Sequence, residues 1–310
     1  MKAVRIHQYG NADVLQIEEI PIPEIREDEV LIKIHATSIN PVDWKVREGH
    51  LKAMNLHNLP LTLGWDVSGT IEKTGSNVTE FNIGDEVYSR PAIERDGSYA
   101  EFIAVKAAEV TRKPKTMTHL EAASIPLAGI TAWETLVTTA HIEKGQRVLI
   151  HAASGGVGTL AVQIAKAKGC YVIGTTSETN VALVKSLGAD EVVDYKKEDF
   201  SELLSDIDVV LDTLGGVVQD KSWKVLKKGG ILVSITQNPN AEIAEKLGVK
   251  SAFVFIGPNV PVLNELTVLI DTGKLKAIVG NVFRLEEMKQ AHLLSESGRA
   301  RGKIVIKVTD

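Results

Sequence analysis

The stretch Arg147–Gly158, which reads RVLIHAASGGVG, decides the fold of this chain of 310 residues. A short apolar strand leads into a loop of small residues that opens a helix, and in this context a glycine fingerprint predicts a dinucleotide site. Ala153 holds the first glycine position, Gly155 the second and Gly158 the third. Gly155 lets the backbone approach a pyrophosphate, and Gly158 lets the helix pack close to the sheet.

The N–H groups of this loop are expected to hold phosphate oxygens at the helix N-terminus. The residues concerned are Ala153, Ser154, Gly155, Gly156, Val157 and Gly158. The alternative is a strand–turn–helix unit with a structural role only.

Strands and helices alternate beyond Thr118, which indicates a parallel, doubly wound sheet. Thr118 and Glu121 form a capping box that opens this region. The expected strands are 147–151, 171–175, 191–194, 208–212, 231–234 and 250–256, and the expected helices are 156–168 and 180–187.

Short strands separated by Gly, Pro, Asn or Asp precede Thr118 and indicate a small barrel-like β domain. They are expected at 14–20, 29–36, 66–72, 86–89 and 99–105. The last segment, 303–308, alternates polar and apolar residues and is expected to pair back into this first domain.

Composition excludes several classes of function. A net charge of −5 without a basic block argues against nucleic acid, which needs a concentrated positive surface. The single cysteine, Cys170, excludes an internal disulfide and a multi-cysteine metal site. No apolar run has the length of a signal peptide or a membrane span, so we expect a cytoplasmic enzyme with no membrane partner.

The residue that follows the second strand of the sheet selects the cofactor. NAD enzymes usually carry Asp or Glu about 20 residues after the fingerprint, where it binds the ribose 2′-hydroxyl. This chain has Thr176 there, and a small hydroxyl accommodates the 2′-phosphate of NADPH. Glu178 is the alternative carboxylate. The phosphate would otherwise contact Ser177, Asn180, Tyr195 and Lys185.

Short motifs in a fixed order along the whole chain resemble the zinc-free quinone oxidoreductase and enone reductase branch of the medium-chain dehydrogenase/reductase superfamily. They include 38–43 (SINPVD), 64–69 (GWDVSG), 84–88 (GDEVY), 97–101 (GSYAE), 126–132 (PLAGITA), 187–190 (LGAD) and 301–305 (RGKIV).

The resemblance implies an α/β fold in which a Rossmann sheet is inserted into a GroES-like β-barrel catalytic domain. It implies a catalytic domain over 1–118, an NADPH-binding Rossmann domain over 119–256, and a return to the catalytic domain over 257–310. Ligands in that architecture bind between the domains, at the carboxyl ends of the strands.

The resemblance also predicts that the chain holds no catalytic zinc ion. The positions that match the zinc ligands of zinc-dependent relatives are Asn40, Trp65 and Ala128, with Asp66 at the acidic neighbour. None of the first three suits zinc, which needs about three protein ligands in a catalytic site. Without a Lewis acid, reduction of an electrophilic quinone or conjugated enone stays feasible, whereas oxidation of a simple alcohol loses its usual activator.

Three residues are candidates for catalysis. Asn40 can donate a hydrogen bond from its amide to the substrate carbonyl, or it is a turn residue before Pro41. Asp43 orients the Asn40 loop, or it only caps the turn. Lys45 donates to an enolate or a cofactor phosphate, or it is a solvated charge.

Further cofactor contacts follow from the matched family positions. Thr131 and Phe255 correspond to residues beside the nicotinamide, although Phe255 can equally be a core residue. Leu214 and Gly215 are expected on the adenosine side, and Arg301 and Lys303 lie in the terminal cofactor-contacting segment.

The sequence therefore predicts an NADPH-dependent oxidoreductase that transfers hydride to a quinone or conjugated enone without zinc. The alternative is a non-catalytic NADPH-binding sensor or structural protein. The apolar segment 250–256 is expected to form an edge strand of the Rossmann sheet. We therefore predict a homodimer joined through this strand, in which a proline at Val254 would weaken association.

Overall fold

The computed structural model describes residues 1–309, which form two compact units. Unit 1 comprises Met1–Leu127, Gly257–Gly273 and the residues from Ala277 on, and unit 2 comprises Ala128–Ile256 and Lys274–Lys276. No helix in the described chain is both long enough and apolar enough to cross a membrane.

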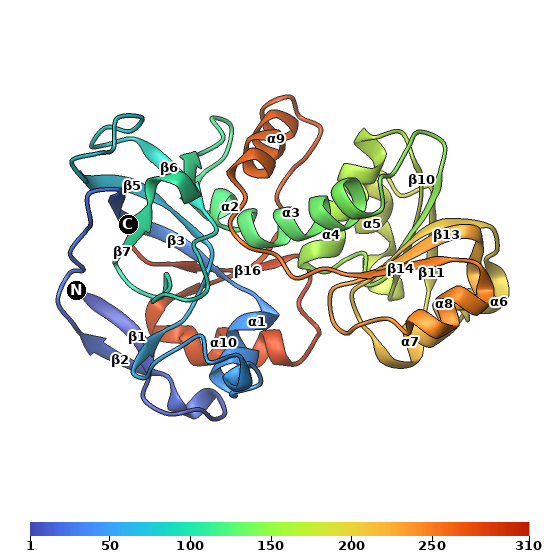
Figure 1. The fold of residues 1–310 in the computed structure, drawn as a ribbon, viewed down its shortest axis with the longest axis horizontal. Helices are drawn as coiled ribbons and strands as arrows, with labels where there is room; N and C mark the ends of the chain where they lie inside the picture. Colours follow the sequence, from blue (N-terminus) through green and yellow to red (C-terminus); the bar gives the residue numbers. More distant parts are fainter. Residues whose placement is uncertain (310) are drawn as a thin grey trace. The chain divides into compact units, whose positions relative to one another are not determined.

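Unit 2 is built on a six-stranded parallel sheet with the strand order β11-β10-β9-β12-β13-β14. Figure 1 labels β10, β11, β13 and β14 of this sheet. Its strands are β9 (Arg147–Ile150), β10 (Tyr171–Thr176), β11 (Glu191–Asp194), β12 (Ile207–Asp212), β13 (Leu226–Ser234) and β14 (Lys250–Phe253). Its helices are α4 (Gly156–Ala167), α5 (Val181–Ser186), α6 (Phe200–Leu203), α7 (Gly216–Ser222) and α8 (Ala241–Leu247). The predicted doubly wound sheet is confirmed.

The central strands are apolar because they are buried on both faces. Every residue of β12 is buried, and α4 packs on β9 and β10. Leu149, Ile173, Val210 and Leu232 form the centre of this core.

The edge position of β14 is confirmed, but the proposed effect of a proline at Val254 is wrong. The Val254 N–H already donates to the Ser234 carbonyl of β13 at 2.9 Å, so it faces into the sheet. In a parallel ladder alternate residues bond to opposite sides. Phe253 therefore presents its N–H and C=O at the open edge.

Unit 1 contains two sheets. A three-stranded antiparallel sheet has the order β2-β1-β4, and a larger sheet has the order β15-β16-β3-β5-β6-β8, with β7 paired to β3. The strands are β1 (Lys2–Ile6), β2 (Gln16–Glu19), β3 (Glu29–Ile39), β4 (Leu61–Thr62), β5 (Val67–Thr74), β6 (Glu86–Ser89), β7 (Phe102–Lys106), β8 (Val110–Arg112), β15 (Val279–Arg284) and β16 (Lys303–Lys307). The helices are α1 (Pro41–Arg47), α2 (His119–Ala123), α9 (Val260–Asp271) and α10 (Met288–Glu296), and α3 (Pro126–Trp133) contains the boundary between the units.

The predicted return of the C-terminal strand is confirmed. β16 pairs antiparallel with β3, from Ile304 opposite Ile39 to Lys307 opposite Ala36, and parallel with β15. This pairing brings Lys303 next to the end of β3, where Asn40 follows.

The boundary between the units differs from the expected one. The capping box of Thr118 and Glu121 is present, but α2 packs on β3, β5 and β16 and so belongs to unit 1. The change occurs at Leu127 instead of Thr118. Residues Lys274–Lys276 join unit 2 because Lys276 exchanges two backbone hydrogen bonds with the Gln163 side chain.

Candidate active site

The loop between β9 and α4 has the geometry that a phosphate-binding loop requires. Gly155 is the N-cap of α4, and the first N–H groups of a helix have no acceptor within it. A Cβ at Gly158 would lie 2.3 Å from the Ala152 carbonyl oxygen, so only glycine permits this approach of helix and strand. The left-handed residue is Ala152, with φ of 47°, and not Ala153 at the first fingerprint position.

The other predicted cofactor residues of unit 2 follow the carboxyl ends of its parallel strands. Ser177 and Asn180 follow β10, Tyr195 follows β11, Leu214 and Gly215 follow β12, and Phe255 follows β14. The topology thus brings them to the same edge of the sheet as the glycine loop. Thr131 does not follow a strand and is a buried residue of α3.

Thr176 is held against the loop. Its buried hydroxyl donates to the Ser154 Oγ at 2.8 Å. Glu178, the alternative carboxylate, is exposed and paired with Lys197 at 2.8 Å, so its charge is balanced. The hydrogen bond that Lys197 donates to the Glu178 carboxylate raises the pKa of Lys197.

One buried acceptor at this edge is unsatisfied. Asp194 ends β11 beside Thr176, and its Oδ2 has no hydrogen-bond partner among residues 1–309. Buried polar atoms in native proteins nearly always have a partner. A ligand that brings a hydroxyl donor fits this position, as a ribose does.

Asp212 shapes the loop after β12 and was not among the predicted residues. Its Oδ1 accepts from the N–H groups of Leu214 and Gly215, at 3.0 and 2.8 Å. Its Oδ2 accepts from Gln219 Nε2 and Ser234 Oγ. The loop is therefore fixed from inside the unit, which leaves Leu214 exposed.

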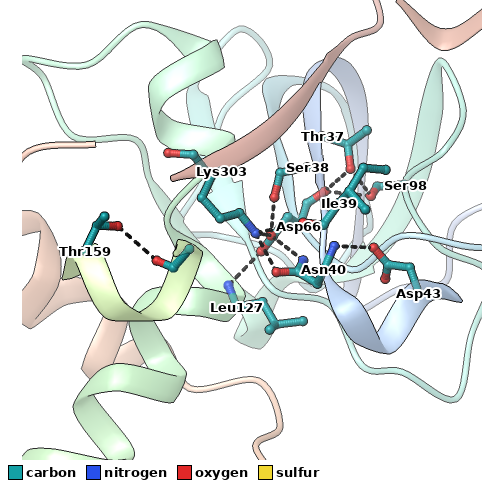
Figure 2. Close-up of polar contacts among 12 residues, drawn as sticks. Thr37, Ser38, Ile39, Asn40, Asp43, Asp66, Ser98, Leu127, Thr159 and Lys303 are labelled. Atoms are coloured by element: carbon teal, nitrogen blue, oxygen red, sulfur yellow. Dashed lines mark hydrogen bonds and ion pairs between the residues drawn. The ribbon is translucent and has the colours of Figure 1, made fainter. Parts of the chain in front are cut away.

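In unit 1 a buried polar cluster surrounds Asn40 (Figure 2). The Asn40 Nδ2 donates to Asp66 Oδ2 at 2.7 Å, and the Lys303 ammonium donates to Asn40 Oδ1 at 2.5 Å. Lys303 also lies 3.4 Å from Asp66 Oδ2. These contacts fix which end of the amide is the donor, and the cluster closes on itself without leaving an unpaired buried charge.

Two more donors complete the environment of Asp66. Ser38 Oγ donates to Oδ2 at 2.5 Å, and the Leu127 N–H donates to Oδ1 at 2.6 Å (Figure 2). Lys303 is thus an internal partner of Asp66 and Asn40, whereas Arg301 is exposed on the turn before β16. The sequence predicted that Lys303 begins a strand that returns to unit 1, but not that its ammonium has buried partners there.

Asp43 and Lys45 both lie on α1. Asp43 is fully buried, accepts the Asn40 backbone N–H at 2.7 Å and so caps the helix. Burial raises the pKa of Asp43 to about 7, against the hydrogen bonds of Asn40 and Tyr99. Lys45 is half-buried with its ammonium 5.7 Å from the Trp44 ring centre, and burial lowers its pKa.

Two of the three positions that match zinc ligands carry no ligand chemistry, and the oxygen of the third, Asn40, accepts from Lys303. Trp65 is buried and directs its Nε1 to the Arg95 carbonyl at 3.4 Å, and Ala128 has only a methyl group. Within residues 1–309, no three His, Cys, Asp or Glu side chains are grouped so that they could hold a metal ion.

Comparison with known proteins agrees with this geometry. A model of the alcohol dehydrogenase GroES-like domain matches residues 26–115, and a zinc-binding dehydrogenase model matches residues 187–306. The chain is 39% identical to the NADPH-dependent alkenal/one oxidoreductase, chloroplastic, of Arabidopsis thaliana over 318 residues, 99% of this chain and 79% of that protein. The chain belongs to the quinone oxidoreductase and alkenal/one reductase branch of the medium-chain dehydrogenase/reductase superfamily.

Two further relatives of this family cover the chain almost completely. The mitochondrial NAD(P)H oxidoreductase RTN4IP1 of Mus musculus is 35% identical over 354 residues, 99% of this chain and 89% of that protein. The solved quinone oxidoreductase of Coxiella burnetii has 37% identity and a TM-score of 0.93, covering 100% of this chain and 99% of that one. The chain is therefore an oxidoreductase of an NAD(P)H-dependent family.

Proposed function

We propose that this protein is an NADPH-dependent reductase of quinones or conjugated enones. The observation that carries the proposal is the oriented amide of Asn40. Its oxygen accepts from Lys303 and its nitrogen donates one N–H to Asp66, so the second N–H of Nδ2 is a donor for a substrate carbonyl.

The charges around Asn40 suit the reduction. Hydride addition to a conjugated carbonyl moves an electron pair onto the carbonyl oxygen, which then takes up a proton. A donor beside the Lys303 ammonium, in a site almost closed to water, stabilises that developing negative charge. The same task falls to zinc in the zinc-dependent relatives.

NADPH supplies the hydride when it is bound. The loop Ala153–Gly158 is proposed to hold the phosphates, and Thr176, Ser177, Asn180 and Tyr195 the 2′-phosphate. Further contacts are proposed for Thr131, Leu214, Gly215, Phe255 and Arg301, whereas the Lys303 ammonium is occupied by Ile39, Asn40 and Asp66. The fit of the glycine loop and the balanced charge of Glu178 support this assignment.

Lys45 is the proposed proton source. A partly desolvated ammonium with a lowered pKa transfers a proton more readily than an exposed one. Asp43 has a different proposed task, which is to hold the loop that carries Asn40.

The proposal is tested by NADPH consumption with a panel of quinones and conjugated enones. Asn40→Ala should lower kcat at least tenfold with at least one of these substrates, because removing one such donor costs about 10²–10³ in other enzymes. Asn77→Ala, at an exposed position of unit 1, is the matched control. Tight NADPH binding without turnover of any substrate would favour the non-catalytic sensor instead.

We also propose that the protein is a homodimer joined through β14. This edge strand is open on one side, and both Phe253 and Phe255 are exposed. Pairing of two identical edges about a two-fold axis is the simplest closed arrangement.

The cellular location is still a prediction. By their names, RTN4IP1 of Mus musculus is mitochondrial and the alkenal/one oxidoreductase of Arabidopsis thaliana is chloroplastic, so relatives of this family do not share one location with the predicted cytoplasmic one.

A further inference from the structure

A second set of buried polar side chains in unit 1 lies next to α1. Arg47 Nη1 lies 3.0 Å from His292 Nδ1, His292 Nε2 lies 3.3 Å from the Tyr99 hydroxyl, and that hydroxyl donates to Asp43 Oδ2 at 2.7 Å. All four side chains are fully buried. The chain of contacts joins helix α10, the loop before β7 and helix α1.

The chemistry of its members fixes the direction of every hydrogen bond. Arg47 can only donate, so His292 accepts at Nδ1 and keeps its proton on Nε2. His292 then donates to Tyr99, and Tyr99 donates to Asp43. Burial and the Arg47 charge lower the pKa of His292 to about 3, which agrees with a neutral ring.

Arg47 is anchored at the other end. Its guanidinium donates to Glu296 at 2.6 Å and to Glu48 at 2.8 Å. Since a guanidinium does not release its proton in proteins, the chain cannot conduct protons past Arg47. The chain of hydrogen bonds instead orients the Tyr99 hydroxyl as a donor to the Asp43 carboxylate.

Asp43 connects Tyr99 to Asn40 through one carboxylate oxygen. The same oxygen, Oδ2, that accepts from Tyr99 also accepts the Asn40 backbone N–H at 2.7 Å, while Oδ1 has no partner among the described residues. A carboxylate without further donors would favour its protonated form when buried.

Other charged groups also act on Asp43. The Asp66 carboxylate disfavours the charged form of Asp43, and the Lys303 ammonium favours it. The buried Arg90 guanidinium also interacts with Asp43. Tyr99 is the neutral donor among these neighbours, so it can be removed without changing the net charge.

We propose that Tyr99 and His292 are positioning residues for Asn40. They keep Asp43 ionised as the acceptor of the Asn40 backbone N–H. This bond caps α1 and thereby holds the Asn40 side-chain amide in place for the substrate. The inference rests on the proposed function for its catalytic meaning, but the positioning itself can be measured without any substrate.

The test is hydrogen exchange of the Asn40 backbone N–H, which donates to Asp43. It is measured as a protection factor between pH 5 and 9 in the full-length protein. Tyr99→Phe removes one donor from Asp43. The pH at which protection of the Asn40 amide falls should therefore rise by about one pH unit, which is a tenfold change in the ionised fraction. Tyr88→Phe is the matched control, because Tyr88 is also buried in unit 1 but bonds to Leu263 and Thr267.

Two variants of His292 separate positioning from packing. His292→Gln can still accept from Arg47 and donate to Tyr99, so it should retain the wild-type profile, whereas His292→Leu should behave like Tyr99→Phe. In turnover assays Tyr99→Phe should lower kcat below about pH 8, one unit above the pKa of about 7 of Asp43, and leave the KM for NADPH unchanged.

An Asn40 protection profile in Tyr99→Phe equal to that of the wild type would overturn the inference, even in an active enzyme. Identical shifts in Tyr88→Phe and Tyr99→Phe would also overturn it. Absence of turnover with every substrate would overturn the proposed function, and the exchange data would still decide the positioning role.

Discussion

Replacing Lys303 by methionine removes the positive charge of the Asn40 cluster and keeps the length of the side chain. Lys303 is 5% exposed and Asp66 0%, so the variant leaves a buried carboxylate without its cation. Breaking one partner out of a buried ion pair costs about 3–5 kcal/mol. Asp66 keeps the donors Ser38, Asn40 and Leu127, so we expect the lower end, about 3 kcal/mol.

The assay is urea unfolding followed by hydrogen exchange of β3 peptides, so that the free energy of unfolding refers to unit 1. The double variant Asp66→Asn/Lys303→Met removes both charges and should recover about 1–3 kcal/mol of the summed single losses. Lys2→Met is the control. Lys2 pairs with Glu286 at 3.3 Å with about half of each side chain exposed, and such surface pairs contribute at most about 1 kcal/mol.

A destabilisation of unit 1 by Lys303→Met no larger than that by Lys2→Met would contradict this expectation. Additive effects of Asp66→Asn and Lys303→Met would also contradict it, because independent effects would mean that the two buried charges do not interact.

Three further variants test the cofactor site and the assembly. Thr176→Asp should weaken NADPH binding relative to NADH by placing a carboxylate near the 2′-phosphate, and equal affinities of the wild type for both in a fluorescence titration would contradict the assignment. Gly158→Ala places a Cβ 2.3 Å from a backbone oxygen and should destabilise unit 2 by about 1–3 kcal/mol in urea unfolding; an unchanged midpoint would refute the close approach. Phe253→Pro should shift the dimer to monomer in light scattering, because it removes an outward N–H, and a wild-type monomer of 33.6 kDa would refute the dimer itself.

The parts of the fold that depend on local signals were predictable from the sequence. The strand and helix around the glycine loop, the capping box of Thr118 and the return of β16 to unit 1 all follow from short-range patterns of polarity and small residues. The predicted ends of the strands were less accurate. β3 continues to Ile39, beyond the expected end at Ala36, because its partner β16 extends the pairing.

The polar clusters were not predictable, because their members are far apart in the chain. Lys303 and Asn40 are separated by 263 positions, and Arg47 and His292 by 245. A lysine at the start of a strand and a histidine on an amphipathic helix carry no signal of a buried partner. Similarly, the strained backbone at Ala152 follows from how the chain leaves β9, which the fingerprint spacing does not specify.

Isotope transfer tests whether hydride moves from NADPH to a conjugated carbonyl substrate without a metal. Chelator-treated protein is incubated with NADPH carrying deuterium at C4 of the nicotinamide and a conjugated enone, and the product is analysed by mass spectrometry. We expect a saturated ketone with one deuterium on carbon from one of the two C4-labelled forms. The rate should equal that of protein that was not treated with the chelator. Unlabelled product from both forms, or activity that returns only with added zinc, would contradict it.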